Sequence, residues 1–200
     1  SKNEAIFETS KKMMLPILYT VLTTICASKK IIKIIDLAQI FHFPILNFVD
    51  NPGFVIGTHA EKSATIKYGA KALAAIYQSK VPICSIILRK VFGVAGAAHM
   101  NHTKYKYRIA WPSADWGSLP FEGGIEAAYK SDINKSKNPK KLIKDIHHRL
   151  SLATSPFKTA EKFLIEDIID PRETRIKACN WIKLAFKKLK VGSSSFGFRP

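Results

Sequence analysis

The chain has 200 residues, of which 46% are hydrophobic, so it can bury one sizeable core and is not a disordered segment. Its formal net charge of +17 permits attraction to the phosphates of nucleic acid, of a coenzyme or of a membrane surface. The lysines run from Lys2 to Lys190, and no zinc finger, arginine-rich arm or aromatic RNA motif accompanies them. We therefore expect one domain, with at most a small appendage, and no nucleic acid among its partners.

The three cysteines, Cys26, Cys84 and Cys179, are far apart and form no C-x-x-C pair, which disfavours a disulfide framework and a zinc site. We expect a reducing compartment and no bound metal, with Cys84 and Cys179 in the core. The longest uncharged stretch, residues 13–27, is shorter than the ~20 residues that a membrane crossing needs, so we expect no membrane span. Since the sequence does not begin with methionine, it gives no information about a targeting peptide.

The first half of the chain alternates short apolar runs, typical of buried strands, with stretches whose apolar residues recur at helical spacing. In order, the expected elements are a polar lead-in at 1–14, a strand within Leu15–Cys26, a helix from the N-cap Ser28 to Phe43, a strand at Pro44–Val49, a turn at Asp50–Phe54, a helix at His59–Gln78 and a strand at Val81–Leu88. The inner face expected for the second helix consists of Ile66, Ala70, Leu73, Ala74 and Tyr77.

The second half continues the alternation and ends in a long amphipathic segment. In order, we expect a strand at Tyr107–Trp111, a helix at Gly124–Ser131, a solvated lysine-rich loop at Ser131–Lys144 leading into a helix, a helix at Pro156–Leu164, a long helix at Pro171–Lys190 and a loose tail at 191–200. The core residues expected in the last helix are Ile176, Trp181, Ile182, Leu184 and Leu189.

Strands that alternate with helices predict an α/β fold with a mainly parallel sheet, because each crossover returns the chain in the same direction. Ligands of such sheets bind beyond the carboxyl ends of the strands. Those ends carry Asn51–Phe54, Phe92–Gly96 and Trp111–Gly117, which we expect to share one site.

The stretch Arg89–Met100 (RKVFGVAGAAHM) follows the third strand and is the centre of this expected site. Its small residues would let a backbone or a ligand approach closely, and the N–H groups of a helix's first turn could then bind an anion. The alternative is that glycine and alanine here only allow close packing of a helix on the sheet. His99, in the same stretch, is interpreted as a helical histidine with its hydrogen bonds satisfied, in preference to a catalytic base.

Several motifs, in register from about residue 20 to residue 200, resemble the carboxyltransferase β subunit of biotin-dependent acyl-CoA carboxylases of the propionyl-CoA carboxylase type. They are the D-x-P-G-F-x-x-G loop at Asp50, the R-K-x-[YF]-G turn at Arg89, the A-W-P strand end at Ala110 and the D-P-x-x-T-R sequence at Asp170. The resemblance covers only the C-terminal half of that subunit. It implies a crotonase/ClpP-like spiral of ββα units with a mainly parallel sheet and a long C-terminal helix, over residues 15–190.

The resemblance also implies a reaction, in which a carboxyl group moves from carboxybiotin to the α-carbon of an acyl-CoA thioester. Both reactants pass through enolate-like anions, which preorganised N–H donors stabilise by ~3 kcal/mol each in comparable oxyanion holes. By resemblance, the backbone N–H groups of Val94 and Ala95 are the donors. The residues implied to line the biotin site are Pro52, Gly53, Phe54, Gly93 and Gly96, and Ala97 falls at the acyl-pocket position.

The implied cofactor is biotin on a separate carrier, and the implied substrate is a coenzyme A thioester. The implied partners are a CoA-binding N-terminal carboxyltransferase half and a biotin carboxylase/biotin carrier subunit, in an oligomer. The expected location is the cytoplasm, or the mitochondrial matrix in a eukaryote. Two alternatives stay open: a non-catalytic scaffold or degenerate subunit, suggested by Val94 and Gly96 where relatives often have Gly and Tyr, and a biotin-dependent acyl-CoA decarboxylase subunit.

Overall fold

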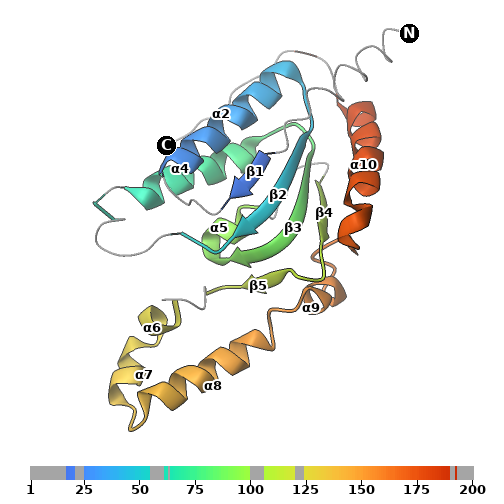
Figure 1. Ribbon diagram of the computed structural model, residues 1–200. Helices are drawn as coiled ribbons and strands as arrows, with labels where there is room; N and C mark the ends of the chain where they lie inside the picture. Colours follow the sequence, from blue (N-terminus) through green and yellow to red (C-terminus); the bar gives the residue numbers. More distant parts are fainter. Residues whose placement is uncertain are drawn as a thin grey trace.

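A parallel six-stranded sheet forms the centre of the molecule in the computed structural model, which describes residues 17–20, 25–54, 61–62, 64–99, 106–119, 124–189 and 192. The strands follow the order β1-β2-β3-β4-β6, and β5 pairs with β3 off this path. Their bounds are β1 Ile17–Thr20, β2 Ile45–Asn51, β3 Ile83–Phe92, β4 Lys106–Ala110, β5 Asp115–Gly117 and β6 Asp167–Ile168. The parallel α/β sheet that the sequence predicts is confirmed (Figure 1).

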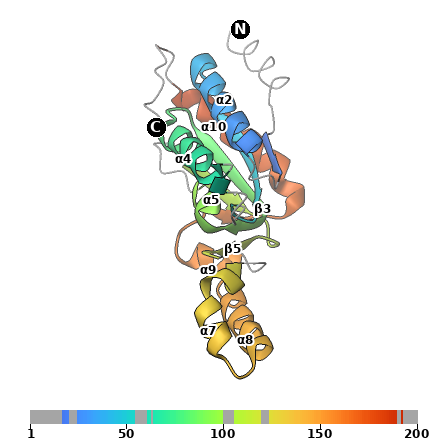
Figure 2. The same ribbon diagram turned by 90° about the vertical axis from the view of Figure 1, so that its left-hand side faces the viewer.

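Helices cover both faces of this sheet, as parallel sheets require. Helices α2 (Ile25–Phe41) and α4 (Thr65–Gln78) lie on one face, and α10 (Thr174–Lys188) lies on the other (Figures 1 and 2). Alternate residues of β2 point to opposite faces, so Ile45 belongs to the core cluster with α2 and α4, whereas Leu46 belongs to the cluster with α10. Among the helices of the described residues, none has the length and hydropathy that a bilayer crossing requires.

Two expectations about the first helices are wrong in detail. The first helix starts at Ile25, so Ser28 is a buried residue inside α2 and not its N-cap. The inner face of α4 is turned from the expected one, because Ile66 and Tyr77 are exposed. Its buried residues are Thr65, Gly69, Ala72, Ala75 and Ile76, whose mostly small side chains let the helix pack closely. The expected helix start at His59 lies outside the described residues.

Residues 124–151 form a helical arm that projects away from the sheet beyond β5 (Figures 1 and 2). It contains α6 (Gly124–Ala128), α7 (Lys130–Lys135) and α8 (Pro139–Ser151), so the expected solvated loop at Ser131–Lys144 is wrong. Helix α8 forms here because Asn138 caps it, with Oδ1 accepting from Lys141 N at 3.1 Å, and Pro139 occupies its first turn.

The C-terminal segment returns to the sheet through α9 (Pro156–Glu161), β6 and a 3₁₀ turn, Pro171–Glu173, which leads into α10. The buried residues of α10 are Ala178, Trp181, Ile182 and Ala185. Trp181 and Ile182 are thus confirmed as core residues, but Ile176 and Leu184 are exposed, since small alanines fill the stripe that faces the sheet. Cys84 is fully buried as expected, whereas Cys179 is exposed. The lead-in at 1–14 and the tail at 191–200, except Gly192, lie outside the described residues.

Candidate functional site

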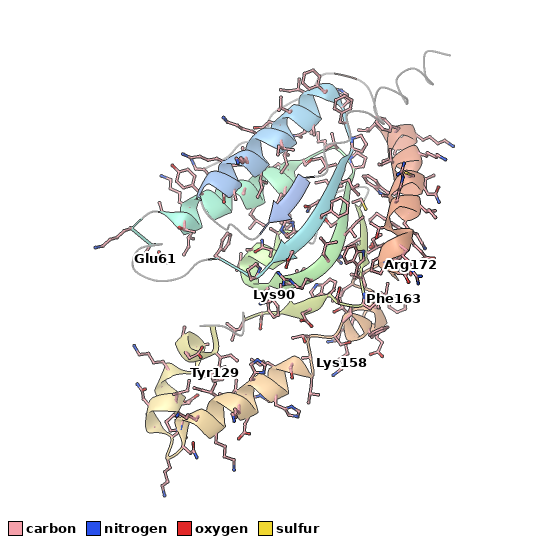
Figure 3. The ribbon with its side chains drawn as sticks, in the orientation of Figure 1. Glu61, Lys90, Tyr129, Lys158, Phe163 and Arg172 are labelled. Carbon is pink, nitrogen blue, oxygen red and sulfur yellow. The ribbon has the colours of Figure 1, made fainter. Side chains whose placement is uncertain are left out.

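The carboxyl ends of β2 and β3 meet at one edge of the sheet, where the sequence places its candidate residues. Asn51 pairs with Val91 after a register irregularity that begins at Val49. Asp50 of β2 connects the two strands, because its carboxylate accepts hydrogen bonds from Arg89 Nη2 at 2.9 Å and from the Lys90 N–H at 3.1 Å, both on β3. This contact raises the pKa of the Arg89 guanidinium, although the guanidinium remains exposed. Lys90 marks this edge in Figure 3.

Strand β3 is longer than expected, since Arg89–Phe92 continue the strand and do not form a turn. The turn is made by Gly93, whose φ of 62° is rare for residues with a side chain, and α5 (Gly93–Ala97) follows at once. The second half of β3 pairs with β5, with Phe92 opposite Gly117. The order of strand, glycine turn and helix that the sequence predicts is therefore confirmed, but the helix has only five residues.

Val94 and Ala95 occupy the first turn of α5, where N–H groups have no acceptor within the helix. The side chain of Val94 is 63% exposed and that of Ala95 is buried. In the part of the chain that the structure describes, neither N–H donates to a carbonyl of a loop or turn, although the carbonyl of Val94 accepts from Ala98 N at 3.1 Å.

Gly96 has a packing role, because α5 lies directly on the end of β3. A Cβ at this position would lie 2.7 Å from the carbonyl carbon of Val91 and 2.9 Å from its Cγ1. Gly96 is buried. The close-packing interpretation of this glycine is therefore supported by the structure, independently of any ligand.

The turn after β2 is held by an asparagine. Asn51 Oδ1 accepts from Gly53 N at 3.1 Å, and Gly53 has a φ of 114°. The ring of Phe54 lies on Gly69 of α4, where a Cβ would come within 2.5 Å of its Cζ. Pro52, Gly53 and Phe54 are thus fixed between the end of β2 and α4.

His99 connects this turn to α5. Its Nδ1 lies 3.0 Å from Asn47 Nδ2, its Nε2 lies 3.4 Å from Asn51 Nδ2, and its N–H donates to Gly96 O at 3.1 Å. The imidazole is 3% exposed, and this burial lowers its pKa from 6.5 to about 4, so it is neutral at pH 7. The expected hydrogen bonding of His99 is confirmed, but its expected helical position is wrong, because α5 ends at Ala97.

A buried polar row runs across the sheet beside His99. Asn47 is the register partner of Ser85, and Ser85 is the partner of Arg108, so the three side chains share one face. All three are buried, and burial lowers the pKa of Arg108. Sequence reasoning did not find this row, since a single asparagine, serine or arginine within an apolar run gives no signal of its partners.

The A-W-P strand end contributes less to this edge than expected. The indole N–H of Trp111 donates to Thr174 Oγ1 at 2.9 Å, and the ring packs with the core cluster of α10. Trp111 therefore fastens β4 to the C-terminal helix. In the residues that the structure describes, no group of three or more His, Cys, Asp or Glu is arranged to hold a metal ion.

The parallel sheet, its crossover helices and its glycine turn define an α/β protein of the crotonase-like class, and solved structures with this fold agree. A transcarboxylase 12S crystal structure, a hexamer with methylmalonyl-coenzyme A and methylmalonic acid bound, matches with a TM-score of 0.71 and 26% identity over 88% of this chain and 34% of that chain. The carboxyl transferase domain model matches residues 22–195, and the chain belongs to this family. The crotonase-like fold implied by the sequence is thereby confirmed.

Two curated relatives show the range of the family. The carboxyltransferase subunit of propionyl-CoA carboxylase from Haloferax mediterranei is 29% identical over 82% of this chain and 32% of its own length. The α subunit of methylmalonyl-CoA decarboxylase from Veillonella parvula is 30% identical over 81% of this chain and 31% of its own length. The chain thus spans about a third of the length of the relatives it matches.

Replacing Gly96 by alanine should destabilise the fold, because the added methyl group must displace the backbone at Val91. We expect Gly96→Ala to lower the free energy of unfolding by about 1–3 kcal/mol in urea denaturation. Gly192→Ala is the matched control, since nothing lies within 4 Å of its Cβ, and its effect should stay below about 0.5 kcal/mol. Equal stabilities of the two variants would contradict the packing role of Gly96.

The neutral, buried His99 should make stability depend on pH. Its pKa falls on folding from 6.5 to about 4, so the unfolded state binds more protons between these values. Stability is therefore unaffected by His99 above pH about 6.5 and decreases as the pH falls from there toward about 4, by about 3 kcal/mol in all. Urea denaturation of the wild type and of His99→Gln over this range should show a shallower decrease for the variant. Parallel curves would rule out this assignment.

Proposed function

We propose that this chain is the biotin-side half of a carboxyltransferase, which moves a carboxyl group from carboxybiotin to the α-carbon of an acyl-CoA when a complementary CoA-binding half is present. The family match over residues 22–195 supports the reaction class. The observation that carries the proposal is the meeting of the α5 first turn with the Pro52–Phe54 turn at one sheet edge, through the pairing of Asn51 with Val91.

In this proposal, the N–H groups of Val94 and Ala95 form the oxyanion hole for the ureido oxygen. Their positions fit the group, because both amides lie in a helix's first turn and no loop or turn carbonyl of the described residues accepts from them. Carboxybiotin supplies the carboxyl group when bound. Each donor contributes about 3 kcal/mol to the stabilisation of the developing charge, as in other oxyanion holes.

The remaining residues shape the site. Gly93 and Gly96 set the path of α5, and Pro52, Gly53 and Phe54 wall the biotin ring, with Phe54 supported by α4. Ala97, on the second turn of α5, is the proposed acyl-pocket residue. All of these groups bind or orient reactants, so the proposed mechanism needs no side-chain nucleophile.

The partners follow from the same proposal. They are the CoA-binding carboxyltransferase half and a biotin carboxylase/biotin carrier subunit, within an oligomer, since the transcarboxylase relative is a hexamer. The proposed single unit at residues 15–190 acts in the cytoplasm or, in a eukaryote, in the mitochondrial matrix. The proposed substrate is an acyl-CoA thioester, and the propionyl-CoA carboxylase relative makes propionyl-CoA the first one to assay.

Two other functions have an observation in their favour. A decarboxylase subunit is favoured by the methylmalonyl-CoA decarboxylase relative, whose similarity equals that of the carboxylase relative. A non-catalytic scaffold is favoured by Val94 and Gly96, which stand where relatives often have Gly and Tyr. The identity of the partner subunits would distinguish a decarboxylase from a carboxylase. Binding of biotin would distinguish either enzyme from a non-catalytic scaffold.

Assembly with the proposed partners should produce activity. We expect the chain, mixed with a CoA-binding half and a carrier charged by a biotin carboxylase, to fix labelled bicarbonate into propionyl-CoA in an ATP-dependent reaction. Omitting the chain should abolish the incorporation. If a complex that assembles fully, as judged by size-exclusion chromatography, still fixes no label, the scaffold function is favoured instead.

Removing one proposed donor should impair this reaction severely. Proline at position 95 lacks the N–H, so Ala95→Pro should lower kcat by about 10²–10³ in a variant that circular dichroism shows to be folded. Lys130→Pro introduces proline at the first residue of α7, away from the proposed site, and should leave kcat within about threefold. A full kcat for a folded Ala95→Pro enzyme would exclude this amide as a donor.

A further inference from the structure

The structure contains a continuous chain of polar contacts between the turn after β2 and the segment after α5. It runs from Gly53 N to Asn51 Oδ1 at 3.1 Å, from Asn51 Nδ2 to His99 Nε2 at 3.4 Å, and from His99 Nδ1 to the Asn47 carboxamide at 3.0 Å. Asn47 also reaches Ser85 Oγ on β3 at 3.5 Å. This series of contacts joins β2, β3 and the segment after α5 through the imidazole of His99.

We propose that His99 is a positioning residue, whose imidazole orients the Asn51 carboxamide toward the Gly53 N–H and so sets the Pro52–Gly53 turn relative to α5. The role of that turn in the reaction rests on the proposed function, whereas the contacts themselves do not. His99 moves with α5, because its N–H is bonded to Gly96 O. The imidazole therefore links the turn after β2 to the segment that follows α5, in addition to the pairing of Asn51 with Val91.

The contacts specify where the imidazole proton resides. The orientation of the Asn51 carboxamide is fixed, because its Oδ1 accepts from Gly53 N, so its Nδ2 donates to His99 Nε2. A neutral imidazole that accepts at Nε2 carries its proton on Nδ1. Among the described residues, Asn47 Oδ1 is a buried oxygen without a hydrogen-bond partner. Rotating the Asn47 carboxamide by 180° brings this oxygen to Nδ1, where it accepts the imidazole proton, and moves Nδ2 to the former place of the oxygen.

The burial of Asn47 and His99 makes their hydrogen bonds important for the conformation of the turn. Asn47 and His99 are only 5% and 3% exposed, so water does not readily replace a lost contact. Protonation of the ring would place a second proton on Nε2, opposite the donating Nδ2 of Asn51. Burial of the imidazole disfavours that charge. The nearby carboxylate of Asp50 is engaged by Arg89 and the Lys90 N–H.

The test measures the turn directly on the intact chain. Nitrogen NMR at pH about 7.5 should show His99 with a protonated Nδ1 and an unprotonated Nε2. Hydrogen exchange of the Gly53 amide should be at least about tenfold faster in His99→Leu and in Asn51→Ala, with no further acceleration in the double variant, since both break one chain of contacts. His99→Gln, which restores an acceptor for Asn51, should stay within about threefold of wild type, as should the exposed control His148→Gln.

Several results would overturn the positioning role. They are a proton on Nε2, an unchanged Gly53 exchange rate in His99→Leu, or fully additive effects of the two single substitutions.

Binding of biotin methyl ester, measured by calorimetry on the same samples, addresses the proposed function separately. A wild type that binds no ester counts against that function, whereas the exchange rates still decide the role of His99. If the wild type binds, His99→Leu should weaken binding about tenfold and His99→Gln should restore it.

Discussion

The close contact between α5 and the end of β3 is the constraint on which the candidate site depends. Gly96 lies on the backbone of Val91 with no space for a Cβ, and Gly93 turns the chain in a conformation that suits glycine. Together they direct the helix back over the sheet, so that its first turn stands at the strand edge and His99 reaches β2. Without this reversal, the amides of Val94 and Ala95 and the turn after β2 would not share an edge.

Most of the fold could be predicted from the sequence, because apolar runs mark buried parallel strands clearly. The strand after residue 81 was predicted too short, since Arg89 and Lys90 interrupt its apolar run. Its charged end is stabilised by Asp50, whose carboxylate binds both residues from the neighbouring strand. A pattern within one strand cannot report a partner on the next. The inner face of α4 was missed for a related reason: alanine and glycine pack as well as isoleucine where helices lie close.

The candidate site was predictable in its backbone and not in its side chains. Strand, glycine and small residues in sequence predict the turn at Gly93, and the motifs carry the resemblance to the family. The polar network was not predictable, because its members are separated by 48 to 52 positions in sequence. His99 was interpreted as hydrogen-bonded, yet only the register of the sheet shows that Asn47 and Asn51 are its partners.

The short strand β5 connects the helical arm to the end of β3. Strand β3 is long enough for its first half to pair with β4 and its last three residues to pair with β5. Strand β5 leads within seven residues to the helical arm, while its partner Phe92 directly precedes Gly93. The strand that precedes the arm in sequence thus pairs with the residue that precedes the Gly93 turn. A substitution that breaks this short ladder would therefore remove backbone support from the start of α5.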